Sequence, residues 1–203
     1  MIIDDKTYKL DVNKYVPLES EKKQIVLGNT FNDGMRHVFG WETRYNGKYK
    51  KTAAFTIDKN GKIYQHFDPK YYSRYFNNPD QNTKSVVILI ENIGWLTKDN
   101  KKNEYTNWFN EKYYGEIDGI MEKKWRDYVY WAPYNDEQLE SAIKLVRTLC
   151  SDLNIPKLVV AHNTKIDDLY DFEGVLYKSN IEKHFTDLNP NWKFEIFKNK
   201  IEL

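Results

Sequence analysis

Five short runs of apolar and β-branched residues predict the strands of one β-sheet. They lie at residues 24–28, 53–58, 62–67, 85–91 and 158–162. The run at 85–91 is apolar at successive positions and is therefore typical of a central strand that is buried on both faces.

The clearest local signal is the pair Asn60-Gly61 between two of these runs. Both residues tolerate positive φ, so the pair predicts a type I′ turn that joins residues 53–58 and 62–67 in a hairpin. A two-residue turn at this point would pair Ile57 with Tyr64 and Phe55 with His66.

Helical spacing of apolar residues predicts the longest helix from Asn135 to about Asp152. Asn135 and Gln138 are spaced as a capping box at its start. A shorter helix is expected over roughly 34–45, with Asp33 as its N-cap.

The order of these elements predicts one α/β domain with a central mixed sheet flanked by helices. Residues 1–21 are polar and aperiodic and are interpreted as an N-terminal arm to a domain at 22–203. Residues 94–133 lack aliphatic periodicity but are rich in aromatic residues, which indicates an insertion. Asn189-Pro190 is expected to open a last helix.

Composition narrows the possible partners. Lys and Arg number 31 against 30 Asp and Glu, so bulk charge indicates no nucleic-acid partner. The 16 Tyr, 10 Phe and 6 Trp argue for a packed core. Cys150 is the one cysteine, so no internal disulfide forms. We see no signal peptide and no membrane-spanning run, and we expect a cytoplasmic protein of the producing or infected cell.

His162 ends the apolar run at 158–162, and Asp171 follows about ten residues later. A histidine at the end of a buried strand with a nearby carboxylate is one way to present metal ligands or a catalytic base. The alternative is that His162 caps a strand and Asp171 caps a turn. Spacing by itself leaves both interpretations open.

Three features follow one another along the chain. The apolar run at 25–27 leads to Thr30, and the hairpin occupies 55–65. The third feature is the segment 134–156, a long helix that leads to Ile-Pro, followed by the strand end at 161–163. Together these features resemble the type-2 N-acetylmuramoyl-L-alanine amidases, a zinc-dependent family that includes phage amidases and peptidoglycan recognition proteins.

The resemblance implies a zinc ion on two histidines and one cysteine or aspartate, with a water that attacks the amide between muramic acid and L-alanine. The first ligand position falls on Gly28, which has no side chain. The second falls on His162, and the third falls where only Asp171 can bind a metal. This ligand set is incomplete, because zinc sites use three or four protein ligands.

The family's supporting groups are also missing by the same correspondence. Its catalytic tyrosine falls on Ala53, its strand glutamate near Leu89, and its lysine on Leu169. His66 is the residue that could replace the missing ligand, and a hydrogen-bonded strand histidine is its alternative role.

The first hypothesis is therefore a pseudoenzyme, an amidase fold with a degenerate zinc site. Its expected partner is a muropeptide, another small polar ligand or a protein. We also consider that a phage encodes it. No cofactor is expected, except zinc if another residue completes the site. The alternative is an active zinc amidase with an altered ligand set. We expect the cleft to be lined by Asn29, Thr30, His66, Glu91, His162 and Asn163.

Overall fold

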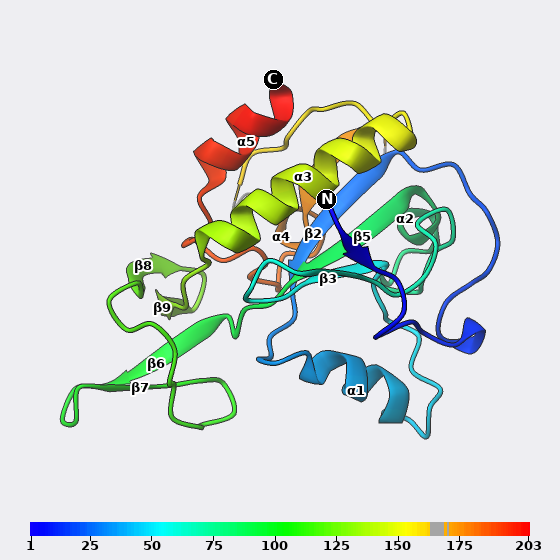
Figure 1. Ribbon diagram of the computed structural model, residues 1–203. Helices are drawn as coiled ribbons and strands as arrows, with labels where there is room; N and C mark the ends of the chain where they lie inside the picture. Colours follow the sequence, from blue (N-terminus) through cyan, green and yellow to red (C-terminus); the bar gives the residue numbers. More distant parts are fainter. Residues whose placement is uncertain (163–168, 170) are drawn as a thin grey trace.

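The computed structural model describes residues 1–162, 169 and 171–203, and positions below refer to this part of the chain. Six strands form one mixed sheet in the order β1-β4-β3-β5-β2-β10 (Figure 1). The expected α/β domain with a central mixed sheet is confirmed. The strands are β1 Ile3–Asp4, β2 Gln24–Asn29, β3 Phe55–Ile57, β4 Ile63–Gln65, β5 Ser85–Ile90 and β10 Gly174–Tyr177.

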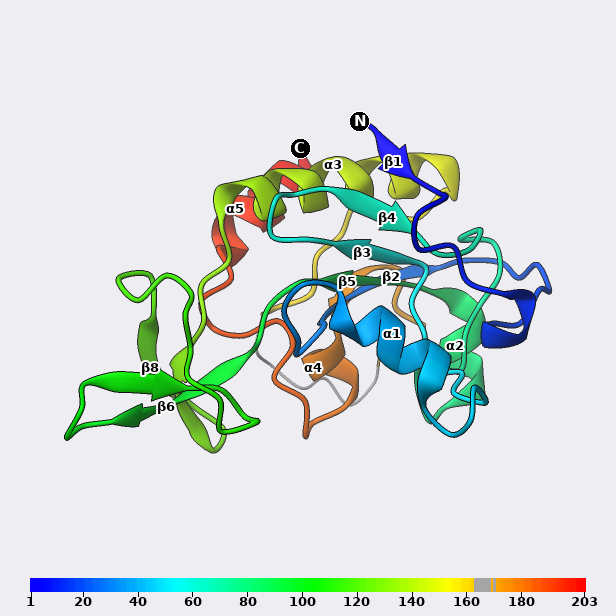
Figure 2. The same cartoon turned by 60° about the horizontal axis from the view of Figure 1, so that its bottom comes forward.

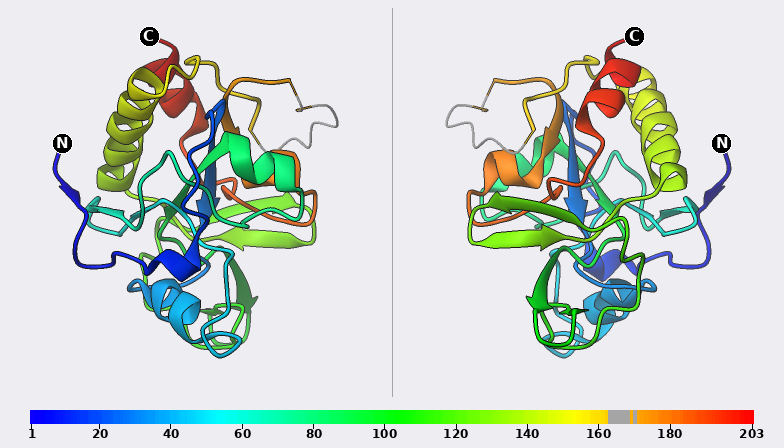
Figure 3. Two further views of the ribbon diagram at one scale, coloured as in Figure 1. Left: turned by 90° about the vertical axis from the view of Figure 1, so that its right-hand side faces the viewer. Right: turned by 90° about the vertical axis from the view of Figure 1, so that its left-hand side faces the viewer.

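Helices cover both faces of this sheet. Helices α3 and α5 lie on one face, and α1 and α4 lie on the other (Figures 2 and 3). None of the helices described is both long and apolar enough to cross a membrane. Their bounds are α1 Arg36–Thr43, α2 Pro79–Lys84, α3 Asp136–Asp152, α4 Lys178–Ile181 and α5 Phe194–Glu202, with a short 3₁₀ helix at Val12–Lys14.

The centre of the sheet is parallel. Strand β2 pairs with β5 on one side and with β10 on the other, and every residue of these three strands is buried. Strand β3 also runs parallel to β5. Because parallel strands end at the same edge, the carboxyl ends of β2, β3, β5 and β10 meet on one side of the molecule, and loops there can form a site.

The expected strand at 158–162 is not the neighbour of β2. Only Val159 forms an isolated bridge, to Val175, while β10 takes the place beside β2. The side chains of Val175, Leu176 and Tyr177 are fully buried. Both segments are short apolar runs, so hydrophobicity could not tell which would pair with β2.

The hairpin between β3 and β4 forms where it was expected, with a different turn. The observed pairs are Phe55 with Gln65 and Ile57 with Ile63, one residue away from the predicted register. The amide of Gly61 donates to the carbonyl of Asp58, and Gly61 has φ of 74°. This geometry is a type I turn followed by a left-handed glycine, so the loop has three residues.

The Asp58 side chain explains this longer loop. Its Oδ1 accepts hydrogen bonds from the amides of Asn60 at 2.9 Å and Lys62 at 2.8 Å. An aspartate that bonds to the backbone two residues further on stabilises a local turn. The Asn60-Gly61 pair alone therefore predicted the place of the turn and not its type.

Helix boundaries follow the predictions unequally. The capping box of Asn135 and Gln138 is present, and α3 begins at Asp136. In contrast, α1 begins at Arg36 after a left-handed Met35, so Asp33 is not its N-cap. Helix α5 begins at Phe194 and not at Asn189-Pro190, because the Asn189 side chain forms a local turn by accepting from the amide of Asn191.

The insertion forms a second sheet beyond the carboxyl end of β5 (Figure 1). Its strand order is β7-β6-β9-β8. A small apolar cluster of its own includes Ile93, Leu96, Tyr113 and Ala132. Its aromatic residues therefore serve partly as a local core. The strands are β6 Trp95–Asp99, β7 Glu104–Thr106, β8 Met121–Trp125 and β9 Tyr128–Trp131.

The N-terminal segment packs against the domain at several points. Strand β1 adds to the sheet beside β4. The buried ammonium of Lys14 donates to the carbonyl oxygens of Trp41 at 3.0 Å, Glu42 at 3.2 Å and Gly47 at 2.6 Å. The carbonyl groups in the last turn of a helix have no partner within the helix, so Lys14 caps the carboxyl end of α1.

Replacing Lys14 by Met is expected to lower the free energy of unfolding by about 2–3 kcal/mol, because buried carbonyl groups lose a charged donor. Urea unfolding followed by circular dichroism measures this change. The exposed Lys6→Met variant is the control and should stay within about 0.5 kcal/mol of the native protein. Equal stability of the two variants would contradict a capping role for Lys14.

Candidate functional site

A cleft of about 370 Å³ opens at the carboxyl ends of β2, β5 and β10, beside α1 and α4. Aromatic side chains form much of its wall. Its described lining includes three cationic side chains and no carboxylate. The lining residues are Asn29, Thr30, Phe31, Asn32, His37, Trp41, Arg44, Tyr49, Lys51, Tyr75, Leu89, Trp95, Trp108, Lys178 and Phe185.

Gly28 precedes Asn29 on β2 and is in register with Leu89 of β5, and both Asn29 and Leu89 line the cleft. A Cβ atom added to Gly28 would lie 3.0 Å from the Tyr75 hydroxyl, 3.1 Å from Asp187 Oδ2 and 3.2 Å from Leu89 Cδ2. These distances are shorter than ordinary van der Waals contacts. The space in front of Gly28 is therefore occupied by neighbouring side chains.

Asp187 supplies the carboxylate next to Gly28. It is fully buried, and its Oδ2 accepts a hydrogen bond of 2.8 Å from the amide of Asn29. Its Oδ1 has no hydrogen-bond partner among the described residues. Burial raises the pKa of Asp187 to about 6, and the charge of Lys178 opposes this rise.

Lys178 brings a buried cation to the same place. Strand β10 ends at Tyr177, which pairs with Leu27 of β2, and Lys178 follows it as the first residue of α4. Its ammonium lies 4.2 Å from the centre of the Tyr75 ring and 3.8 Å from a carboxylate oxygen of Glu182. Burial lowers the pKa of Lys178, while Asp187 and Glu182 raise it.

Two of the residues expected in the cleft do line it. The Oδ1 atom of Asn29 accepts a hydrogen bond from the Tyr134 hydroxyl, and its Nδ2 is buried without a partner among the described residues. The Thr30 hydroxyl donates to the carbonyl of Asn32 at 2.8 Å. Both side chains are thus held in place by residues around the cleft.

His162 and Asp171 lie at opposite ends of β10. The His162 ring stacks on Phe194 at 5.2 Å and contacts Tyr177, the last residue of β10. Asp171 lies just before β10 and lines a separate hollow with Lys23. The structure therefore does not bring the two proposed metal ligands together. Asn163 lies outside the described residues.

His66 lies in the interior, beneath α1, and not in the cleft. Its Nδ1 is 2.8 Å from the carbonyl oxygen of Tyr8, and its Nε2 is 2.9 Å from the Thr56 hydroxyl. The same hydroxyl is 3.0 Å from Nε2 of His37, which lines the cleft. Burial lowers the pKa of His37 to about 3 and that of His66 to about 4, so both imidazoles are neutral at pH 7.

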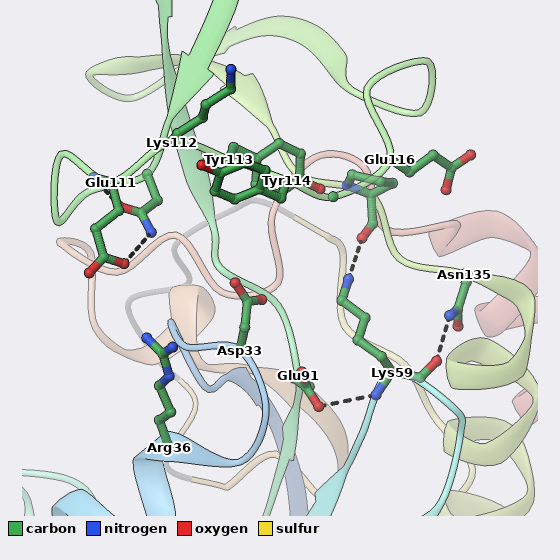
Figure 4. A pocket seen from close by; sticks show the side chains of 13 residues that line it. Asp33, Arg36, Lys59, Glu91, Glu111, Lys112, Tyr113, Tyr114, Glu116 and Asn135 are labelled. Carbon is green, nitrogen blue, oxygen red and sulfur yellow. Dashed lines mark hydrogen bonds between the residues drawn. The ribbon is translucent and has the colours of Figure 1, made fainter.

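Glu91 lines a second cavity, of about 710 Å³, between the sheet and the insertion (Figure 4). Its carboxylate accepts from the amides of Gly34 at 2.7 Å and Lys59 at 3.1 Å. The Asp33 side chain points toward Tyr113 across the cavity. Charges of both signs line this charged pocket, at Asp33, Arg36, Lys59, Glu91, Glu111, Lys112 and Glu116.

The sequence patterns did not point to Asp187, which lies beside Gly28, or to Lys178, whose charge acts on Asp187. Lys178 follows the apolar run of β10, the same pattern that drew attention to His162. Asp187 precedes Asn189-Pro190, which was interpreted as a helix start. Within the described part of the chain, no three His, Cys, Asp or Glu side chains come close enough to hold a metal ion.

The raised pKa of Asp187 predicts a pH-dependent effect of Asp187→Asn. Folding favours the protonated acid, so the cost of the buried charge is absent below pH 3.8 and complete above about pH 6. Relative to the native protein, the variant should gain stability as pH rises through this window, by up to about 3 kcal/mol.

Urea unfolding of both proteins between pH 4.5 and 7.5 measures this difference. A constant effect of the substitution, such as a changed hydrogen bond to Asn29, cancels when pH values are compared. Asp118→Asn, at an exposed position in the insertion, is the control. A difference that does not change with pH would show that Asp187 does not titrate in this range.

The fold matches solved structures, and the sequence matches the profile of one family. The solved structures of N-acetylmuramoyl-L-alanine amidase LysC from Clostridium intestinale, hydrolase AmiA from Staphylococcus aureus and AmpDh3 from Pseudomonas aeruginosa share the fold, with TM-scores of 0.57, 0.57 and 0.55. Their sequences are 14%, 10% and 14% identical to this chain.

The alignments cover 100%, 100% and 98% of this chain and 99%, 82% and 66% of those three chains. No curated protein sequence gives a significant match. The profile of the N-acetylmuramoyl-L-alanine amidase family matches residues 19–171, more than half of the chain. The chain therefore belongs to the N-acetylmuramoyl-L-alanine amidase family.

Proposed function

We propose that this family member binds a muropeptide-like ligand in the cleft and does not cleave the muramoyl–alanine bond with a zinc-activated water. The observation that carries the proposal is the environment of Gly28. A glycine stands where the family resemblance implies the first metal ligand, and Tyr75, Asp187 and Leu89 surround the position that a side chain would take.

The residues at this point do not fit a zinc ion. Zinc in proteins needs three or four nitrogen, sulfur or oxygen ligands in close contact. The polar groups beside Gly28 are the carboxylate of Asp187 and the hydroxyl of Tyr75. The ammonium of Lys178 acts on the same carboxylate and lowers its pKa. An ammonium carries no lone pair and repels a dication. The arrangement therefore supports a site that functions without zinc.

The cleft itself remains suited to a ligand. Its volume of about 370 Å³ lies in the range of small-molecule sites. Aromatic side chains, including Tyr49, Trp95 and Trp108, line it and offer apolar faces to a sugar ring. One protein with the same fold, AmpDh3, was solved in complex with an anhydromuramic pentapeptide. A glycopeptide is therefore the ligand class that we propose.

The alternative, an active zinc amidase with an altered ligand set, would need His162, Asp171 and His66 to converge on one ion. His162 and Asp171 flank the two ends of β10, and both ring nitrogens of His66 already have partners. No observation favours this alternative, and the following experiments can still establish it.

We expect the native chain to release no peptide stems from purified peptidoglycan, even with excess zinc, because it cannot assemble the family's metal site. Mass spectrometry of the soluble fraction measures release, and an active family amidase on the same substrate is the positive control. Calorimetric titration with a soluble muropeptide should meanwhile show saturable binding. Stem release that His162→Ala abolishes would establish the alternative function.

We also expect purified protein to hold well under one zinc per chain after treatment with a mild chelator. The triple variant Gly28→His, Tyr75→Phe, Lys178→His should hold more, because it adds two imidazoles beside Asp187 and removes the crowding hydroxyl. Elemental analysis measures both. One chelator-resistant zinc per native chain would overturn the proposal. The matched control is the same variant with Asp187→Asn, which should lose the gain.

A further inference from the structure

We infer that the cleft recognises an oxyanion, a carboxylate or a phosphate on a glycan or glycopeptide ligand, and that the Lys178 ammonium is its anchor. This inference rests on the proposed function, because it takes the cleft to be free of zinc. It adds the chemical group that the ligand must carry, which the family fold alone does not specify.

The charge of the cleft lining favours an anionic ligand. Arg44, Lys51 and Lys178 line it, and its described lining contains no carboxylate. The neighbouring charged pocket differs, because it is lined by four carboxylates and three cations. The excess of cations is therefore a property of the cleft and not of the whole surface near the insertion. Clustered charges of one sign in a concave site attract ligands of the opposite sign.

The surroundings of Lys178 also favour an anionic ligand. Its side chain is only 9% exposed, and the oxygen of Glu182 at 3.8 Å is beyond hydrogen-bond length. The rings of Phe185 and Tyr75 lie 3.5 Å and 4.2 Å from the ammonium. Aromatic faces favour a cation but do not accept its N–H groups in strong hydrogen bonds. Glu182 is an ion-pair partner, but no described residue accepts a hydrogen bond from the ammonium, so its N–H groups are available for a ligand oxygen.

Asp187 supports the positive charge of Lys178 from beneath the cleft. With a pKa of about 6, its carboxylate is mainly ionised at pH 7. This buried negative charge favours the protonated form of Lys178, although burial alone disfavours it. The anion of a ligand would bind the ammonium from the cleft, and Asp187 would interact with the same ammonium from the protein interior.

The aromatic walls of the cleft favour a sugar ring as the part of the ligand that carries the anion. The Trp108 indole is fixed by a hydrogen bond of 2.9 Å from Nε1 to the carbonyl of Phe31. Trp95 stacks on Tyr128 with ring centres 4.2 Å apart. These fixed rings line the cleft, whose volume is about 370 Å³. A ring that carries an oxyanion matches both the walls and Lys178.

Three sugars test the inference directly. N-acetylglucosamine is neutral, N-acetylmuramic acid adds a carboxylate, and N-acetylglucosamine 1-phosphate adds a phosphate. Two-dimensional NMR titration of the full chain should show that at least one of the anionic sugars binds about tenfold or more tightly than the neutral sugar. The tighter of the two identifies the source of the oxyanion. The preference should weaken as salt is raised.

Variants separate the anchor from general charge. Lys178→Met should abolish the preference for the anionic sugars, and Lys178→Arg should retain much of it. Lys22→Met replaces a buried lysine at the far end of β2 and should leave the preference unchanged. Urea unfolding verifies that each variant is folded. If Lys178→Met does not fold, the comparison of the three sugars on the native chain still tests oxyanion recognition, and Lys178→Arg still tests the anchor.

Equal affinity for all three sugars, no binding of either anionic sugar, or an unchanged preference in folded Lys178→Met would each overturn the inference. These outcomes differ from failure of the proposed function, which is release of peptide stems or tight zinc binding by the native chain. A chain that binds muropeptide without turnover and ignores the oxyanion would leave the proposed function standing.

Discussion

A buried carboxylate needs hydrogen-bond donors or an opposite charge close by, and the carboxylate of Asp187 is such a group. The Asn29 amide meets one oxygen from the end of β2. Lys178 meets the charge from the beginning of α4. Strand β2 and the segment from Lys178 to Asp187, which are far apart in the sequence, are thereby held together at the edge where the parallel strands end.

Features that depend on neighbouring residues could be predicted from the sequence. The capping box of Asn135 and Gln138 starts α3, since both groups lie within one helical turn. Asn60-Gly61 marked the place of the β3–β4 hairpin. Its turn type was missed, because the Asp58 side chain adds hydrogen bonds that favour a three-residue loop. Local chemistry thus gave the elements but not always their register.

Features that depend on distant residues could not be predicted in the same way. Two apolar runs compete for the place beside β2, and only their packing decides in favour of β10. The same choice determines which charged residues reach Gly28. With β10 in place, Asp187 lies beside Gly28 and Lys178 acts on Asp187, while Asp171 lines a separate hollow. One non-local pairing therefore decided both the fold at this edge and the composition of the candidate site.

The Thr56 hydroxyl lies within hydrogen-bond distance of two histidines, His66 and His37, and this arrangement fixes which group donates in each hydrogen bond. The Tyr8 carbonyl can only accept, so His66 carries its proton on Nδ1 and presents a lone pair on Nε2. Thr56 must then donate to His66, and its oxygen is left to accept from Nε2 of His37. A backbone carbonyl of the N-terminal segment thus selects the tautomer of a histidine in the wall of the cleft.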